Sequence, residues 1–170
     1  MPPHPHVALA IDAVKYYLEN GEPLPCPKNL PEAMKRKSGT FVSIKKNGVL
    51  RGCIGTITPS EPDLAREIIR NAVSAATRDP RFPPVSRKEL ADLTFSVDVL
   101  TPPEKVDDVS DLDAGKYGII LKGETKQAVL LPNLEGIDTV EEQMTICRKK
   151  AGLRKNDPVE LFRFRVERFH

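Results

Sequence analysis

The 170 residues of this chain are enough for one domain, or for one domain with a small additional lobe. Hydrophobic residues make up 39% of the chain and charged residues 29%, which excludes a largely disordered protein. The net charge of +2 is too small to favour a nucleic-acid-binding or membrane-binding surface.

The first elements predicted along the chain are two helices. Apolar residues recur at helical spacing from Val7 to Asn20, and Gly21 follows where a C-terminal cap belongs. A proline-rich loop comes next. A short helix is then expected from Pro31 to Lys37, with the proline in its first turn.

The strongest local signal is a β-hairpin around Asn47-Gly48. Both residues tolerate the positive φ angles of a type I′ turn, and strand-like runs flank them at 40–45 and 49–54. A two-residue loop makes Lys46 face Val49. The same register sets three further pairs: Val42 with Cys53, Ile44 with Arg51, and Phe41 with Ile54.

This register has a consequence for the segment Leu50-Arg51-Gly52-Cys53-Ile54-Gly55. Side chains alternate across a strand, so Arg51 and Cys53 are expected on the same face. Gly52 and Gly55 are poor strand residues. They indicate a bulge, or a close approach of another group to the backbone.

Two further helices are predicted before the next strand. Ser60 and Asp63 resemble a capping box that opens a helix reaching about Thr77, and Asp79-Pro80 stops it. After a stiff proline-rich loop, Ser86 and Glu89 form a second capping box that opens a short helix.

The C-terminal half alternates between strands and one helix. The expected elements are a strand at 94–99, a surface excursion at 104–115, a hairpin pairing 117–121 with 127–131, a helix from Thr139 to Gly152, and a last strand at 162–166. Hairpins outnumber strand–helix–strand units. The fold class is therefore α+β, with a mainly antiparallel sheet and helices packed on it.

Cysteine usage and hydropathy predict a soluble, cytoplasmic protein. Cys26, Cys53 and Cys147 are widely spaced and form neither a disulfide framework nor a structural zinc site. No apolar run reaches the roughly 18 residues of a membrane span, and the N-terminus lacks a signal-peptide pattern. The histidines lie near the chain ends and are expected to be solvated, so no metal site is predicted.

Cys53 is the sharpest candidate for chemistry. A free thiol with a pKa near ~8.5 is mostly protonated at neutral pH, and a cation such as Arg51 would lower that pKa. The alternative is a small buried residue that fills space in the sheet, since no histidine or carboxylate adjoins it in sequence to act as a base. Both interpretations remain open at this stage.

Asp79-Pro80-Arg81-Phe82 is the second candidate. Arg81 on a stiffened loop could bind a carboxylate or phosphate through two hydrogen bonds, and Asp79 could orient an arginine. The alternative is a helix stop followed by a surface arginine. No G-x-G-x-x-G or Walker motif is present, so the sequence supports no nucleotide cofactor, and it assigns no other.

At this point the chain resembles a known family. The resemblance rests on Gly39-Thr40-Phe41-Val42, on Gly48 to Gly55, on Asp79-Pro80-Arg81-Phe82 and on Lys150-Ala151-Gly152-Leu153. These segments are similar to the AMMECR-type domain family, named after the Alport syndrome, mental retardation, midface hypoplasia and elliptocytosis region protein. One departure is Asn133-Leu134, where the family commonly carries Gln-Val.

The resemblance implies a single two-lobed domain over residues 1–170. A small lobe would lie within roughly 20–60, the termini in the larger lobe, and a cleft near the segment from Leu50 to Gly55. It implies no activity, because the family is biochemically uncharacterised. Relatives resemble partners of a Memo-like, dioxygenase-related protein and of a radical-SAM protein.

Three functional hypotheses follow. In the first, the protein is an enzyme: Cys53 is a nucleophile or redox thiol, and arginines hold a small anionic substrate. The residues assigned to this substrate site are Arg51, Gly52, Ile54, Gly55, Asp79 and Arg81. In the second, a binding or scaffold module works with a Memo-like or radical-SAM partner. The third, nucleic-acid binding by the basic C-terminal strand, has the least support.

Overall fold

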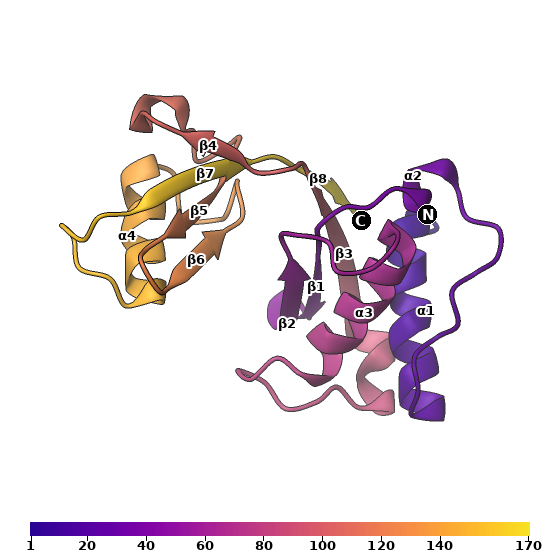
Figure 1. Cartoon of the computed structure of the whole chain (residues 1–170). Coiled ribbons are helices and arrows are strands. Elements are labelled where there is room, and N and C mark those ends of the chain that lie inside the picture. The colour runs from indigo at the N-terminus through magenta and orange to yellow at the C-terminus, as the bar shows by residue number, and fades with distance from the viewer. The chain divides into compact units, whose positions relative to one another are not determined.

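The computed structural model describes residues 1–170 and separates into two units (Figure 1). Unit 1 comprises residues 1–100 and 167–170, and unit 2 comprises residues 101–166. Each unit contains a four-stranded sheet, in the orders β2-β1-β3-β8 and β4-β7-β5-β6. The pairs β1–β2, β1–β3, β4–β7, β5–β6 and β5–β7 are antiparallel, which confirms the predicted α+β class.

The predicted helices and the hairpin of unit 1 are present. Residues 20–60, where the resemblance implies a small lobe, belong to unit 1, and so do both termini. Its elements are α1 (Pro5–Asn20), α2 (Glu32–Lys35), β1 (Thr40–Lys46), β2 (Val49–Thr56), α3 (Leu64–Thr77), the 3-10 helix η1 (Arg87–Asp92), β3 (Leu93–Leu100) and β8 (Val166–Phe169).

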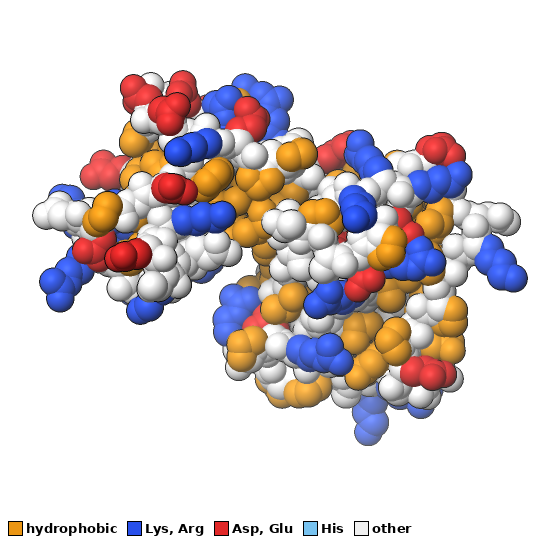
Figure 2. All heavy atoms as spheres, viewed as in Figure 1, with side chains coloured by type: hydrophobic (Ala, Val, Ile, Leu, Met, Phe, Trp, Pro, Cys, Tyr) orange, Lys and Arg blue, Asp and Glu red, His pale blue; other side chains and the backbone are white.

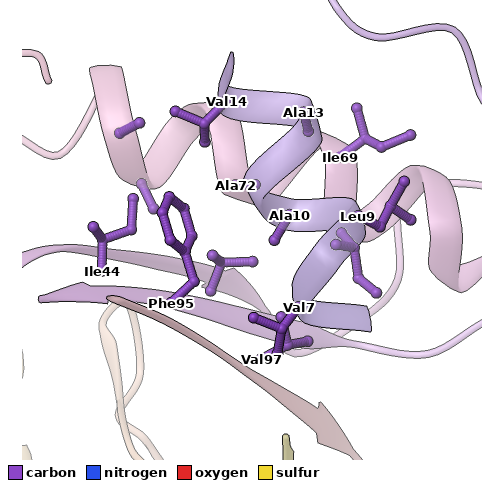
Figure 3. Close-up of a cluster of buried hydrophobic side chains, with 14 of the residues drawn as sticks. Val7, Leu9, Ala10, Ala13, Val14, Ile44, Ile69, Ala72, Phe95 and Val97 are labelled. Carbon is purple, nitrogen blue, oxygen red and sulfur yellow. The ribbon is translucent and has the colours of Figure 1, made fainter. Parts of the chain in front are cut away.

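The core of unit 1 lies between its two long helices and one face of its sheet. Figure 3 shows Val14 of α1 and Ala72 of α3 above Ile44 and Phe95 of the strands. Alanines on α3 carry little bulk, so the helix approaches the strands closely. An ideal Cβ built on Gly52 would lie 2.1 Å from the carbonyl oxygen of Ala75. The close backbone approach predicted at this glycine is confirmed.

The start of α3 differs from the prediction. Asp63 is the N-cap, and its carboxylate accepts the N–H of Arg66 at 2.8 Å. Ser60 instead donates its N–H to the carboxylate of Glu67 at 2.7 Å. This fully buried carboxylate also accepts a hydrogen bond from the Thr56 hydroxyl at 2.8 Å. A capping serine would have to lie directly before the first helical turn, and Ser60 lies too far upstream.

The hairpin turn is as predicted, but its register is not. Asn47 and Gly48 have φ values of 51° and 78°, as a type I′ turn requires. A bulge then interrupts the β1–β2 ladder next to Ile44 and Lys45, and confirms the bulge that the glycines indicated. The observed pairs are Lys45 with Leu50, Ile44 with Gly52, Ser43 with Cys53, Val42 with Ile54, and Phe41 with Gly55. Arg51 is the extra residue, so the three predicted pairs beyond Lys46 and Val49 are wrong.

Unit 2 packs one helix against its sheet. Its elements are β4 (Glu104–Val106), the 3-10 helix η2 (Val109–Asp111), β5 (Gly118–Lys122), β6 (Gln127–Leu130), α4 (Val140–Ala151) and β7 (Glu160–Phe164). Thr139 caps α4 by accepting the N–H of Glu142 at 3.1 Å, and Gly152 ends it at φ 67°, both as predicted. The expected surface excursion at 104–115 contains β4 and η2.

The predicted last strand is in fact two strands of different sheets. β7 pairs with β4 and β5 in unit 2, whereas β8 joins β3 in unit 1. Arg165 lies between them, and its N–H binds the Thr101 hydroxyl at 2.8 Å. The alternation of apolar and polar residues continues across this break. It indicates the direction of the side chains, but it does not indicate which strand is the neighbour.

Candidate functional site

Cys53 lies on the face of the unit 1 sheet that is opposite the helices. Its partner in β1 is Ser43, which alternates with the buried, core-facing Val42 and Ile44. The Cys53 thiol and the Ser43 hydroxyl are 3.2 Å apart and share a hydrogen bond. The cysteine is partly exposed, so its sulfur is not sealed into the aliphatic core.

The backbone of Cys53 is bound to the loop that follows α3. Because β2 is an edge strand, its outward N–H groups have no neighbouring strand. The N–H of Cys53 donates to Oδ2 of Asp79 at 3.0 Å. The two motifs singled out in the sequence, residues 50–55 and residues 79–82, are therefore joined directly.

Asp79 orients Arg81, as the sequence suggested. The Asp79 side chain is only 2% exposed, and it accepts Nε of Arg81 at 3.0 Å and Nη2 at 2.8 Å. These hydrogen bonds from Arg81 are the main reason that the pKa of Asp79 is lowered to about 2. The Arg81 side chain remains 56% exposed, so this cation has a fixed geometry and an open side.

Arg51 is directed away from Cys53. Its Nε and Nη2 bind the two oxygens of Glu89 at 3.1 and 3.3 Å, and its Nη1 binds the carbonyl of Pro83 at 2.8 Å. Glu89 also accepts a hydrogen bond from the ammonium group of Lys46. Lys46 lies two residues after the buried Ile44, so Glu89 and Arg51 are on the same side of the sheet as Ile44. The expectation that Arg51 and Cys53 share a face is wrong, because the bulge at Arg51 changes the alternation.

Arg51 instead attaches residues 83–89 to β2. Its side chain is only 13% exposed, and Nη2 reaches a second carbonyl, that of Pro84, at 3.3 Å. The hydrogen bonds from Arg51 are the largest influence that lowers the pKa of Glu89 to about 2. Each of the three guanidinium nitrogens therefore has at least one partner within the chain.

The glycines and Ile54 of the six-residue segment are occupied by packing. The aromatic ring of Phe41 covers Gly55, where an added Cβ would lie 2.2 Å from the ring carbon Cγ. Gly52 lies against Ala75, and Ile54 packs on the core opposite Val42. Each of these contacts gives a structural reason for the residue type at that position.

The surroundings of Cys53 keep its thiol protonated. Burial is the largest influence on the pKa of Cys53 and raises it, while the Ser43 hydrogen bond and the charge of Arg81 act in the opposite direction. Arg51 is not among the influencing groups. A thiol with a raised pKa is a weak nucleophile at neutral pH.

A second charged pair lies close to Cys53 and was not anticipated from the sequence. Asp98 of β3 is 2% exposed and accepts Nε and Nη2 of Arg168 of β8 at 2.7 and 2.9 Å. Asp98 acts to raise the pKa of Cys53. The pairing joins residues 70 positions apart, and Asp98 continues a polar face with Thr94 and Ser96, so no signal in the sequence marks it.

His4 and His6 are not solvated tails, so that prediction is wrong for these two histidines, whereas His170 is exposed. His4 caps α1 through Nδ1 and stacks on Phe169 with ring centroids 4.1 Å apart. His6 is 4% exposed, and burial is the main reason that its pKa is lowered to about 4. No group of three or more histidine, cysteine or acidic side chains is arranged to hold a metal ion.

The other two cysteines lie outside this site. Cys147 is fully buried in the core of unit 2, and burial raises its pKa to about 11. Cys26 is partly exposed in the loop after α1. None of the helices combines the length and the apolar character needed to cross a membrane.

Comparison with known proteins gives a consistent family. A family model described as AMMECR1 matches residues 7–169. A protein of Thermotoga maritima is 49% identical over 169 residues, which cover 98% of this chain and 97% of the relative. The crystal structure of an uncharacterised protein from Pyrococcus horikoshii has 34% identity and a TM-score of 0.88, with 96% of this chain and 88% of that chain covered.

One relative is much longer than this chain. A protein of Clostridium acetobutylicum is 46% identical over 166 residues, which are 96% of this chain but 35% of the relative. The chain therefore spans about a third of that protein.

Proposed function

The chain belongs to the AMMECR1 family, and we propose that it is a ligand-binding module that holds a small anionic group at Arg81, beside Cys53, without a covalent step. One observation carries the proposal. The Arg81 guanidinium is fixed by two hydrogen bonds to a buried carboxylate and is still more than half exposed. A positioned cation with an open side is the usual arrangement for binding a carboxylate or phosphate.

The free donors of Arg81 determine which ligand it would accept. Nε and Nη2 bind Asp79, whereas Nη1 takes part in no hydrogen bond within the chain. Because Asp79 already balances the charge of Arg81, affinity would come from directed N–H donors more than from net charge. The Ser43 hydroxyl and the Cys53 thiol share one hydrogen bond near this guanidinium and could donate to a second ligand atom.

Anion binding can be measured by two-dimensional amide NMR with inorganic phosphate and with acetate. We expect shifts confined to the amides of Ser43, Cys53, Asp79, Arg81 and Phe82, and we expect their loss in Arg81→Gln. Arg87→Gln is the matched control, because it removes an exposed arginine of unit 1 that lies outside the candidate site. Equal shifts in the wild type and in Arg81→Gln would refute the proposal.

The thiol-dependent alternative has its own test. Cys53 as a nucleophile or redox thiol would need a lowered pKa, and burial acts against this. The rate of iodoacetamide alkylation at pH 7 can be followed at Cys53 by peptide mass spectrometry. We expect a rate no higher than that of a free model thiol. A faster rate would favour the enzyme hypothesis over non-covalent binding.

A second candidate function is a module that works with a partner protein. The observation that favours it is the Clostridium relative. The region that matches this protein is only 35% of that relative and is joined there to further sequence. The partner suggested by the family resemblance is a Memo-like or radical-SAM protein. Size-exclusion chromatography of this protein mixed with a purified Memo-like protein tests the idea, and separate elution at micromolar concentrations would count against a stable complex.

Nucleic-acid binding is not proposed. Arg163 and Arg165 lie against the ring of Tyr117, with their guanidinium carbons 4.4 and 5.3 Å from its centroid, and Arg168 is paired with Asp98. On the face shown in Figure 2, basic and acidic side chains are interspersed and do not form a continuous basic area. These arginines therefore have partners within the protein.

A further inference from the structure

Unit 1 contains a cavity that is separate from the surroundings of Cys53. It has a volume of about 310 Å³ and lies along α3, between that helix, the end of α1 and the loop that follows α1. The helices cover one face of the sheet, whereas Cys53 and Ser43 point to the other. The cavity is within the size range of small-molecule sites in proteins.

The walls of this cavity are apolar on one side. Ile69 and Val73 are buried residues one turn apart on α3, and Tyr17 of α1 and Leu24 of the loop are partly buried opposite them. Its volume equals roughly ten water molecules at about 30 Å³ each. A ligand with about ten to fifteen non-hydrogen atoms, mostly apolar, would fill this space.

Three arginines line the cavity together with a single acidic residue. Arg66 is paired with Asp63, and Arg70 lies 3.5 Å from the lining carboxylate of Glu61. Arg78, just beyond the end of α3, forms no ion pair and no side-chain hydrogen bond within the chain. The lining therefore carries an unbalanced positive charge beside an apolar wall.

We propose that this cavity binds a small amphipathic anion, a molecule with an apolar body and one carboxylate, and that Arg78 is its main charged contact. The apolar body would lie on Ile69, Val73 and Leu24, and burial of its methylene groups would supply most of the affinity. The carboxylate would supply orientation through the guanidinium. The inference does not depend on the site at Arg81, because the two use different residues.

Cys26 provides a direct reporter of occupancy. It lines the cavity, is partly exposed, and its sulfur lies 3.7 Å from the carbonyl oxygen of Pro27. A bound ligand would shield this thiol from alkylation. A free model thiol added to the same sample serves as the reference, since Cys53 adjoins the anion site proposed at Arg81.

The experiment measures iodoacetamide modification of Cys26, relative to that of the added model thiol, by mass spectrometry in the presence of octanoate, 1-octanol or acetate. Octanoate has the apolar body and the charge, octanol only the body, and acetate only the charge. We expect saturating octanoate to slow the modification of Cys26 about tenfold or more and to leave the model thiol unchanged. Octanol should need at least about tenfold higher concentrations for the same protection, and acetate should give none, because the charged contact and the apolar burial are both required.

Two variants test the charged contact. Arg78→Gln should weaken protection by octanoate about tenfold and leave protection by octanol unchanged, because a charge-assisted hydrogen bond is lost. Arg87→Gln, an exposed arginine outside the cavity, should change neither. Octanoate that fails to protect Cys26 up to its solubility limit would overturn the proposal. Equal protection by octanol and octanoate, or unchanged octanoate protection in Arg78→Gln, would do so as well.

Discussion

Two arginine–carboxylate contacts involve the segment 79–89, and they differ in exposure: Arg51 joins the segment to β2, whereas Arg81 and Asp79 both lie within it. The side chain of Arg51 is 13% exposed and uses Nε and both terminal nitrogens on Glu89 and two proline carbonyls. The side chain of Arg81 is 56% exposed and uses one edge of its guanidinium on Asp79. The same chemical pair therefore serves attachment in one place and presentation of a cation in the other.

The comparison shows how a structural arginine can be distinguished from one available to a ligand. Residue type and motif do not separate them, since both lie in segments that looked functional from the sequence. What separates them is how many donors are already used and how much of the guanidinium solvent can reach. Four predictions test this distinction, in order of decreasing effect.

The largest effect is expected from Gly52→Ala. Gly52 adjoins Arg51, and the new methyl group would collide with the carbonyl oxygen of Ala75, a backbone atom that cannot move aside. The variant should lose about 3 kcal/mol or more of unfolding free energy, because β2 must separate from α3. The hydrogen bonds that join β2 to Asp79 and Glu89 must then lengthen as well. Urea denaturation measures the loss.

Val49→Ala is the control for that variant. Val49 is 70% exposed in the same strand and should change the free energy of unfolding by less than about 0.5 kcal/mol. If Gly52→Ala unfolded within about 1 kcal/mol of the wild type, the packing of β2 on α3 would be much looser than described.

The second effect is expected from Arg51→Ala. Glu89 would keep Lys46 but lose two hydrogen bonds from Arg51, and the carbonyls of Pro83 and Pro84 would lose a donor, so the variant should lose about 2–3 kcal/mol of unfolding free energy. Arg51→Lys should recover only part of this, because an ammonium group cannot form the same fork. Full stability of Arg51→Ala by urea denaturation would remove the structural role given to this arginine.

The third effect is a loss of stability in acid. The folded-state pKa of Glu89 and of Asp79 is about 2, below their ordinary values of 4.5 and 3.8. The unfolded chain therefore takes up protons first as the pH falls. The stability contributed by these carboxylates is complete above about pH 4.5 and is lost progressively towards pH 2.

Between pH 5 and pH 3 each carboxylate should account for about 1–2 kcal/mol of that loss. Urea denaturation at several pH values measures it. Glu89→Gln and Asp79→Asn should each be less stable than the wild type at pH 6, and each should show a shallower decline in acid. Parallel declines in the wild type and both variants would mean that these carboxylates do not carry the acid sensitivity.

The smallest effect on stability is expected from Arg81→Ala. Its guanidinium is more than half exposed, so solvent screens the ion pair, and Asp79 keeps the backbone N–H groups of Cys53 and residue 81. The loss should be about 1 kcal/mol, smaller than that of Arg51→Ala. If the order of the two variants were reversed in matched urea titrations, the assignment of structural and ligand-facing roles would be reversed too.

Much of the architecture could be predicted because it depends on local chemistry. The turn at Asn47-Gly48, the cap at Thr139 and the helix end at Gly152 each follow from residues within a few positions. The register of the hairpin could not be predicted in the same way. A single extra residue, Arg51, moves Cys53 from Val42 to Ser43, and no local preference marks which of the neighbouring residues forms the bulge.

The candidate site was predicted in its residue types but not in its partners. Cys53 and Asp79 were both singled out, and they are 26 positions apart in sequence and joined by a hydrogen bond. The partner of Arg51, Glu89, was noted only as part of a helix cap, and it fills both roles. Contacts of this kind depend on the path of the loop from the end of α3 back to β2. The periodicity of apolar residues does not predict that path.

The place of β8 in the chain has a consequence for biosynthesis. This strand completes the sheet of unit 1, but the ribosome makes it only after all of unit 2. Until β8 is made, residues 1–100 therefore have the edge of β3 unpaired, and Asp98 lacks its partner Arg168. The stacking of His4 on Phe169 joins residues that lie on either side of unit 2 in the sequence, and contacts of such long separation are slow to form.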